Sequence, residues 1–283
     1  MKPAITLRPM TLADVAFADA VRAHAGWNQL PADWRRLLDY EPGGCFVAEW
    51  EGTPAGTATT TRYGTELAWI GMVLVHPDYR RRGLGQALLR QCLEYLRAVP
   101  CVKLDATPLG KGLYEQLGFQ GELGLQRWQG TGPRHCEASD PALRPWEDAL
   151  LDAISKLDQQ AFGVPRKAML KALAHGSAHA LVHLEQGEVK GYGLLRPGTR
   201  AHYIGPVVAA TARIGCQLVR HLAAQAPGQP IFWDILDDNA EALQVAKSLD
   251  FTPQRPLLRM FRGSNPWPGD PKRQFAIADP STG

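Results

Sequence analysis

The sequence predicts an α/β fold built from two tandem domains, each a curved mixed sheet flanked by helices. Three observations support this prediction: the length of the chain, the alternation of strand-like and helix-like segments, and the return of one order of segments in the second half. The chain has 283 residues, which fits two domains of ordinary size, and either half can bury its own core. We expect the first domain at residues 1–128, a linker at 129–145 and the second domain at 146–283.

The first half shows a regular succession of strands and helices. Leu67–Val75 is a nearly continuous apolar run, which predicts a strand buried on both faces. Apolar residues then recur at helical spacing through Leu84–Leu96, which predicts a helix packed against a sheet. Thr107 and Pro108 suit an N-cap and a first helical position, so a further helix is expected to begin there and end at Gly118. The remaining expected elements are strands at 4–8, 45–49, 55–62 and 102–106, helices at 12–25 and after Pro31, and a last strand from Phe119.

The second half repeats this order after a linker that contains several glycines and prolines. We expect a helix at 149–162, a hairpin at 178–195, strands at 203–209 and 231–235, and helices at 214–225 and 239–249. Short matches accompany the repeat: Ile70–Val73 aligns with Ile204–Val207, and Leu117–Phe119 aligns with Leu249–Phe251. We interpret these matches as a weak internal duplication, with chance similarity as the alternative.

Composition and charge argue against several classes of function. The formal charge is +3, from 31 basic and 28 acidic side chains, so the sequence predicts neither a nucleic-acid nor an anionic-membrane partner. The five cysteines are an odd number without a C-x-x-C pair, which argues against a disulfide framework or a cysteine zinc site. No stretch approaches the ~20 apolar residues of a membrane helix, and no signal peptide is evident at the N-terminus. A reducing cytoplasm is the expected compartment.

The segment Val73–Gln86 carries the strongest chemical signal. A buried strand turns through two glycines and enters a helix, and unpaired N–H groups at a helix start, together with the helix dipole, favour an anion. Glycine lets phosphate oxygens approach the backbone, and neighbouring arginines add positive charge. An ordinary strand–helix connection with solvated arginines is the alternative. The turn matches neither the P-loop nor the dinucleotide fingerprint, because only R-x-x-G-x-G is present.

At this point the chain resembles a known family. The pattern V-x-P-x-x-R-x-x-G-x-G at Val75–Gly85 resembles the acetyl-CoA signature of the GCN5-related N-acetyltransferases (GNAT). The downstream segments Leu104–Ala106 and Leu113–Phe119 resemble the strand–helix–strand ending of that family, and the resemblance covers about residues 4–125. It implies acetyl-CoA as co-substrate, with its pantetheine arm on the strand and its pyrophosphate in the turn. The implied binding residues are Val73, Leu74, Val75, Arg80, Arg81, Arg82, Gly83, Leu84, Gly85 and Gln86.

The resemblance also implies a catalytic acid but leaves the base open. Tyr114 would lie near the sulfur and protonate the departing thiolate, and a phenol near ~10 is matched closely enough to a thiol near ~8.5 for proton transfer. A packed core tyrosine is the alternative. The family often has an acid near Gly71 or Met72, and this chain has none there. Four other side chains are candidates for the base: Glu49, Glu66, His76 and Asp105.

The second half lacks this chemistry. Ala246 aligns with Tyr114, and the segment 209–215 has no R-x-x-G-x-G turn, so we expect a degenerate domain that shapes the substrate pocket. The family's acceptor pocket usually forms after the first helix, which suggests Trp27 and Asn28. Asp158, Phe162 and Arg166 are candidates from the second half. Core packing for Trp27 and Phe162, and a surface pair for Asp158 and Arg166, are the alternatives.

These observations predict an N-acetyltransferase that acetylates a primary amine of a small molecule or peptide by direct attack. The expected partners are acetyl-CoA and an amine acceptor, and the oligomeric state is left open. A non-catalytic acyl-CoA-binding sensor or interaction module is the main alternative, and a phosphate-ligand kinase is a weaker one. His175, His179 and His183 have the spacing of a metal site, but Gly176 argues against one continuous helix, so no metal is expected.

Overall fold

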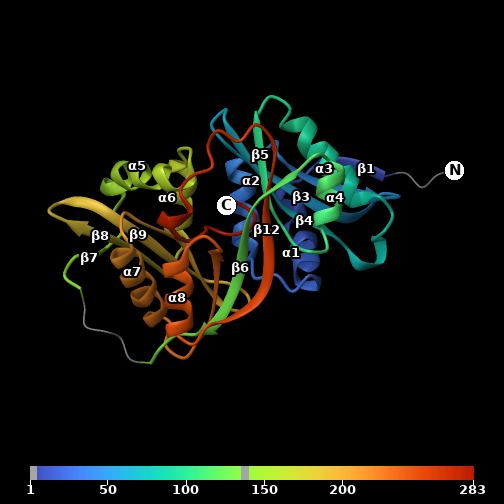
Figure 1. Cartoon of the computed structure of the whole chain (residues 1–283). Coiled ribbons are helices and arrows are strands. Elements are labelled where there is room, and N and C mark those ends of the chain that lie inside the picture. Colours follow the sequence, from blue (N-terminus) through green and yellow to red (C-terminus); the bar gives the residue numbers. More distant parts are fainter. Residues whose placement is uncertain (1–4, 135–139) are drawn as a thin grey trace.

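The computed structural model describes residues 5–134 and 140–283. Two lobes lie side by side in Figure 1, and two long strands, β6 (Gln120–Thr131) and β12 (Thr252–Gly263), run between them. These strands belong to one mixed sheet of 13 strands that extends through both lobes. The predicted mixed α/β class is therefore confirmed, and the two expected sheets are joined edge to edge.

In the first half the sheet has helices on both faces. Helix α3 packs on one face of the sheet, and α1 and α2 pack on the other. The strand expected at Leu67–Val75 is present with those bounds. The helix expected to begin at Thr107 is wrong in its start: α4 begins at Lys111, because Thr107 and Gly110 close a turn first through a 3.0 Å backbone hydrogen bond. The elements are β1 (Ile5–Pro9), α1 (Val15–His24), α2 (Pro31–Tyr40), β2 (Cys45–Trp50), β3 (Thr53–Tyr63), β4 (Leu67–Val75), α3 (Leu84–Tyr95), β5 (Cys101–Ala106) and α4 (Lys111–Gln116).

The second half repeats the first half's order of elements. The succession β4–α3–β5–α4–β6 returns as β10–α7–β11–α8–β12. The corresponding helix ends close with matching backbone bonds, from Phe119 N–H to the Tyr114 carbonyl (3.1 Å) and from Phe251 N–H to the Ala246 carbonyl (2.9 Å). The predicted duplication is confirmed. The elements are β7 (Leu143–Pro145), α5 (Leu151–Phe162), α6 (Lys167–His175), β8 (His179–Glu185), β9 (Glu188–Arg196), β10 (His202–Ala209), α7 (Ala212–Ala224), β11 (Pro230–Leu236), α8 (Ala240–Ser248) and β13 (Gln274–Ala276).

The two halves exchange their last long strands. The strand order is β1-β2-β3-β4-β5-β12-β6-β11-β10-β9-β8-β7, so β12 of the second half pairs with β5 of the first half, and β6 of the first half pairs with β11 of the second. The segment expected as a linker therefore begins inside a strand, because Gly130 and Thr131 pair with Ile231 and Pro230. Part of that segment, residues 135–139, lies outside the described residues.

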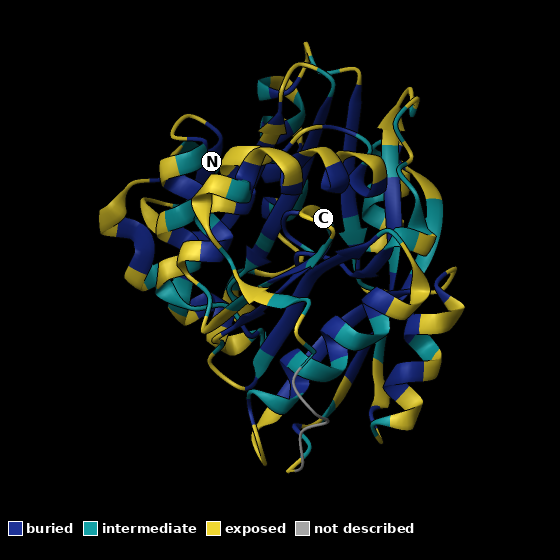
Figure 2. Cartoon of the chain, turned by 90° about the vertical axis from the view of Figure 1, so that its left-hand side faces the viewer, coloured by how far each residue is buried: buried dark blue, intermediate teal, exposed yellow. Residues whose placement is uncertain are grey.

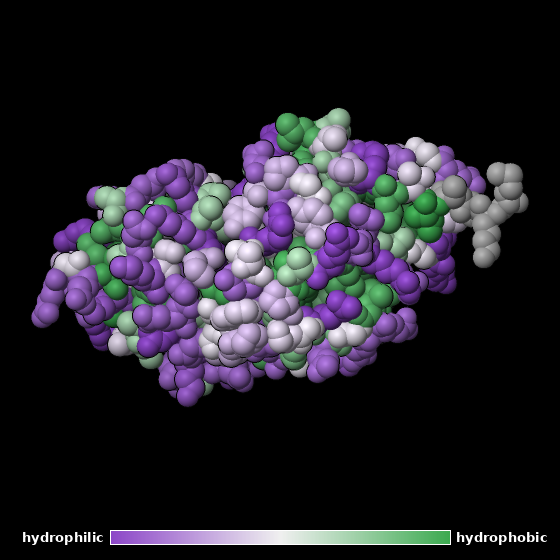
Figure 3. All heavy atoms as spheres, turned by 90° about the horizontal axis from the view of Figure 1, so that it is seen from above, coloured by the Kyte–Doolittle hydropathy of each residue, from purple (hydrophilic) through white to green (hydrophobic). Residues whose placement is uncertain are grey.

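Burial follows the layers of the fold. Figure 2 shows the central strands buried and the outward faces of the helices exposed. The view from above in Figure 3 is mostly hydrophilic, with hydrophobic atoms in scattered patches. None of the helices in the described ranges is long and apolar enough to cross a membrane.

Candidate functional site

Strands β4 and β5 separate in the middle of the sheet. They pair in parallel only from Leu67–Trp69 to Cys101–Lys103, although β4 continues to Val75. A bulge accompanies the separation: Ile70 and Val73 both pack on the α3 side, so two residues lie between them where strict alternation allows one. One of these, Met72, has φ of +50°, an uncommon value for a residue with a side chain. The separation leaves backbone groups available to a ligand that enters between the strands.

The start of α3 lies next to this opening. Gly83 is the N-cap with φ of +87°, and the first helical bond runs from the N–H of Ala87 to the Gly83 carbonyl. The N–H groups of the intervening residues have no helical acceptor and are available to an anion. A Cβ on Gly85 would meet only Leu113 at 3.7 Å and Val75 at 3.8 Å, which are ordinary contacts. Packing does not require glycine there, whereas close approach of a ligand does.

The three arginines of the turn are exposed and lie beside the helix start. The guanidinium of Arg82 stacks over Trp50 at 4.8 Å, and Nε of Arg80 donates to the Val75 carbonyl at 3.3 Å. Arg81 takes a left-handed backbone conformation with φ of +61°. The turn therefore presents positive charge and backbone N–H groups together, as an anion site needs.

Tyr114 lies on α4 close to the same opening. Its neighbour Leu113 approaches Gly85 and Val75, and the Tyr114 ring packs edge-to-face on Phe119 with centroids 6.1 Å apart. Burial, followed by the nearby Cys92, raises the pKa of Tyr114 to about 12. The phenol is therefore protonated at neutral pH and can donate a proton.

Two of the four candidate bases are held in ion pairs. Asp105 is fully buried and accepts two bonds from Arg259 of β12, at 2.9 and 3.0 Å, and burial raises its pKa. Glu49 pairs with Arg8 at 2.6 Å. The other two candidates lie at opposite ends of β4: Glu66 and His76.

The segment after β13, which we call the C-terminal segment (Ile277–Gly283), fills the space beside the β4 bulge. Ser281 packs on Gly71 so closely that a Cβ on Gly71 would lie 2.5 Å from the Ser281 carbonyl oxygen. The segment is buried along most of its length. Three side chains donate hydrogen bonds to its backbone carbonyls: Tyr63 (2.6 Å), Trp69 (3.2 Å) and Arg166 (2.7 Å). The sequence did not predict the position of the C-terminal segment, because its residues have no periodic apolar pattern.

The candidate acceptor residues fall into two groups. Asn28 is buried and clamps the two halves together: its side-chain oxygen accepts from the N–H groups of Arg200 and Ala201, both at 3.0 Å. Trp27 is half-buried against the core of α1 and α2. These two residues follow α1 and face the loop after β9.

The second group surrounds Gly283. Asp158 and Arg166 are both fully buried and form a two-bond ion pair at 2.9 and 3.0 Å, so a surface pair is excluded. The Arg166 guanidinium lies 3.8 Å over the Phe162 ring and donates to the Gly283 carbonyl. These three side chains lie together, and Arg166 and Phe162 contact Gly283. Their place in an acceptor pocket stays a prediction.

A small polar pocket with a cavity volume of about 20 Å³ lies between the halves. Sequence analysis identified only one of its residues, Asn28. Gln29 and Asp33 follow it closely but carry no motif, and the other residues are far away in the chain. Together they come from α2 and the loop before it, β6, the end of β9 and the start of β10, and the C-terminal segment. The lining residues are Asn28, Gln29, Asp33, Arg127, Arg196, Pro197, Tyr203 and Asp279.

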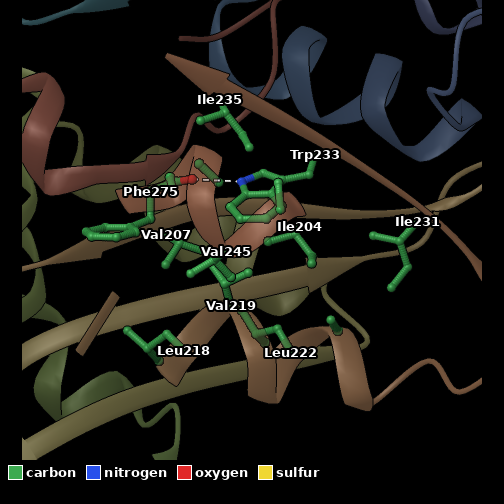
Figure 4. Packing of buried hydrophobic residues seen from close by; sticks show 14 of the residues in the cluster. Ile204, Val207, Leu218, Val219, Leu222, Ile231, Trp233, Ile235, Val245 and Phe275 are labelled. Atoms are coloured by element: carbon green, nitrogen blue, oxygen red, sulfur yellow. Dashed lines mark hydrogen bonds between the residues drawn. The ribbon is translucent and has the colours of Figure 1, made fainter. Parts of the chain in front are cut away.

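The equivalent opening in the second half is filled by the chain itself. Strands β10 and β11 pair in parallel only over three residues, from His202–Ile204, and β13 then pairs with the continuing part of β10. Figure 4 shows the bond from Trp233 Nε1 to the Phe275 carbonyl, 2.7 Å long, that fixes β13 there. A Cβ on Gly215, at the start of α7, would lie 2.3 Å from the Phe275 ring. The ring therefore packs directly against the first turn of α7.

The three histidines with metal-like spacing lie on two elements. His175 ends α6 and its Nε2 lies 3.1 Å from an Asp148 oxygen, whereas His179 and His183 belong to β8. No cluster of three potential metal ligands occurs in residues 5–134 and 140–283.

Known proteins share this fold and these motifs. Residues 15–119 match the family described as acetyltransferase (GNAT) family, and residues 154–276 match one described as acetyltransferase (GNAT) domain. Two family matches in succession, on a fold with two copies of the same element order, define a tandem acetyltransferase architecture. The chain belongs to the GNAT acetyltransferases and is a tandem member of that family.

Relatives share this assignment over different lengths. The uncharacterized N-acetyltransferase YitH of Bacillus subtilis is 27% identical over 164 residues, which cover 57% of this chain and 58% of YitH. The holothin acyltransferase of a Pseudoalteromonas species is 24% identical over 275 residues, which cover 96% of this chain and 92% of that protein. Among solved structures, a Pyrococcus horikoshii protein described as an acetyltransferase has a TM-score of 0.86 at 23% identity, covering 99% and 96%. A tandem GNAT protein from the clavulanic acid biosynthesis pathway has a TM-score of 0.65 at 18% identity, covering 92% and 98%.

Proposed function

We propose that this protein is an N-acetyltransferase that moves the acetyl group of acetyl-CoA to a primary amine of a small molecule or peptide by direct attack. The observation that carries the proposal is the opening between β4 and β5 next to the glycine-containing start of α3. The backbone of β4 at Val73–Val75 would pair with the pantetheine arm, and the segment Arg80–Gln86 would hold the pyrophosphate. The family to which the chain belongs supports the same assignment.

In this proposal Tyr114 acts as the general acid. The amine nitrogen attacks the thioester carbonyl, the carbon–sulfur bond breaks, and the leaving sulfur takes a proton from the Tyr114 hydroxyl. The proton that the attacking nitrogen loses passes to solvent, and solvent returns a proton to the tyrosinate. A phenol with a pKa of about 12 is a weaker acid than a thiol near ~8.5. Transfer of the Tyr114 proton to the released thiolate is therefore uphill by roughly 3–4 pKa units. Reprotonation of the tyrosinate through solvent, which balances the proton that the amine gives up, completes the step.

We further propose one acyl-CoA site per chain. The second half lacks a tyrosine at Ala246, and β13 with Phe275 fills its opening. Its role in this proposal is structural: it supplies β12 to the first half's sheet and the C-terminal segment to the acceptor side of β4.

The test is thiol release from acetyl-CoA with a panel of amines, polyamines, amino acids, aminoglycosides and peptides, using wild type and Tyr114→Phe. We expect the variant to bind acetyl-CoA normally and to lose about 100-fold or more in turnover at neutral pH. Tyr40→Phe is the matched control, because its hydroxyl only donates to the Arg62 carbonyl at the protein surface. Acetyl-CoA binding without thiol release from any amine would instead favour a non-catalytic acyl-CoA-binding module.

A further inference from the structure

The pocket between the halves contains two buried arginines that turn one nitrogen each away from their protein partners. Arg127 uses Nε and Nη2 on Asp234, and Arg196 uses Nε and Nη2 on Asp279 and on the carbonyls of Gly205 and Ala278. Neither Nη1 atom makes a hydrogen bond within the described part of the chain. Both arginines are at least nine-tenths buried and line the pocket, so these donors are directed to whatever occupies it.

The charges around the pocket do not balance. The two arginines that line the pocket each have an ion-pair partner: Asp234 for Arg127 and Asp279 for Arg196. The lining carboxylate Asp33 is paired with Arg36. Two further arginines have no ion-pair partner in the described residues: Arg200, and Arg255 of β12, which is the register partner of Arg127 on β6.

Like charges directly opposite each other on neighbouring strands are unfavourable. An anion bound between Arg127 and Arg255 would reduce this repulsion. The Nε atom of Arg255 is buried and has no hydrogen-bond partner in the described residues. Burial, followed by repulsion from Arg127, lowers the pKa of Arg255 to about 10. The cluster therefore carries an excess of positive charge, which an anion would reduce.

A neutral hydrogen-bonding group completes the pocket. Gln29 lines it, and its side-chain oxygen is buried without a hydrogen-bond partner in the described residues. Because amide oxygen and nitrogen can exchange places by a flip of the group, Gln29 can offer a donor to an anion at the same position.

The pocket is close to the place where transfer would occur. Asp279 lines the pocket, and Ser281, two residues further on, packs on Gly71 at the β4 bulge. Two residues span at most about 7 Å. A ligand whose anionic group lies at the arginines can therefore bring a second group to the bulge across only a few bonds.

We propose that this pocket binds the carboxylate of the acceptor, and that the acceptor is a small amino acid-like molecule with its amine and carboxylate a few bonds apart. The inference rests on the function proposed above. A carboxylate suits the site because it is a small anion and because the planar guanidinium fork matches its geometry. The small size of the pocket favours a small acceptor over an extended peptide.

The first arm of the test compares standard amino acids with their amides as acceptors, since each pair differs only in the carboxylate charge. We expect at least one amino acid to drive thiol release from acetyl-CoA, with a KM about tenfold or more below that of its amide. Amines without a carboxylate that are used with an equal or lower KM would overturn the pocket assignment while leaving the N-acetyltransferase proposal intact.

The second arm uses Gln29→Glu, which places a carboxylate among the arginines in nearly the same volume. We expect the KM for the amino acid to rise about tenfold, with the KM for its amide and for acetyl-CoA nearly unchanged. Gln159→Glu is the matched control, because it makes the same charge change at an exposed position on α5. Equal effects of the two variants on the amino acid would contradict the proposal.

The third arm is independent of turnover. The same amino acids at millimolar concentration should raise the Tm of wild type and of Gln159→Glu, and should have no effect on Gln29→Glu. If these shifts appear but no amine is ever acetylated, the anion pocket stands and the N-acetyltransferase proposal falls. If neither wild type nor the control responds to any amino acid, the pocket assignment is wrong.

Discussion

The contact between Gly71 and Ser281 gives a sharp prediction for Gly71→Ala. A Cβ on Gly71 would lie 2.5 Å from the carbonyl oxygen of Ser281 and 2.6 Å from its Cα, so backbone must move by nearly 1 Å. The C-terminal segment cannot yield freely, because Tyr63, Trp69 and Arg166 hold its carbonyls. Overpacking of this kind costs about 1–3 kcal/mol. We expect the free energy of unfolding to fall by that amount.

The measurement is urea unfolding followed by tryptophan fluorescence, together with the Tm, which should fall by roughly 2–6 °C. Gly121→Ala is the matched control: it is also a strand glycine, but its Cβ would meet only Leu258, at 3.5 Å. The control should stay within about 0.5 kcal/mol of wild type. Should Gly71→Ala prove as stable as the control, the claim that the segment is packed on the β4 bulge would be refuted.

Two further predictions concern pH and ligand stoichiometry. The pKa of Asp14 is lowered from 3.8 to about 2, first by its bonds from Arg8, so its stabilising effect is complete above pH ~4 and is lost as pH falls through ~2. Between pH 4 and pH 2, the free energy of unfolding should therefore fall by about 1–2 kcal/mol less in Asp14→Asn than in wild type. An equal fall in both proteins would argue against the ion pair of Arg8 and Asp14. Calorimetric titration with acetyl-CoA should give one equivalent per chain, and two equivalents would mean that a ligand displaces β13.

Local patterns predicted much of the fold. The strand Leu67–Val75 and the helix from Leu84 were predicted because apolar periodicity is set within each segment. The start of α4 was wrong because a local turn, closed from Gly110 to Thr107, overrode the N-cap signal of the sequence. Strand β13 and helix α6 were not predicted. Strand β13 has only three residues, which is too short to show an alternating pattern.

The exchange of β6 and β12 could not be predicted from local patterns. A strand's alternation says which face is buried, but not which edge it pairs with, and the two halves of a duplicated chain offer similar edges. The consequences for the site are large. Asp105 was a candidate base, and its pairing with Arg259 becomes visible only when β12 lies next to β5.

The site was predictable to the extent that its residues are close together in the chain. The turn and Tyr114 belong to one continuous stretch, and their arrangement follows from a strand, a helix and a short connection. The pocket residues have no such link. Arg127 and its partner Asp234 are 107 positions apart, and Arg166 meets Gly283 across 117 positions. Nothing in a local pattern pairs such residues, because only the tertiary fold brings them together.

The strand exchange explains how the second half contributes to the structure around β4. The first half's sheet continues from β5 only through β12, which the second half supplies, and the acceptor side of β4 is closed by a segment that begins at β13. The same β13 fills the second half's own opening. One stretch of chain, β13 with the C-terminal segment, thus fills the opening between β10 and β11 and packs beside β4. The continuity of β13 with the C-terminal segment therefore links the filling of the second half's opening to the packing beside β4.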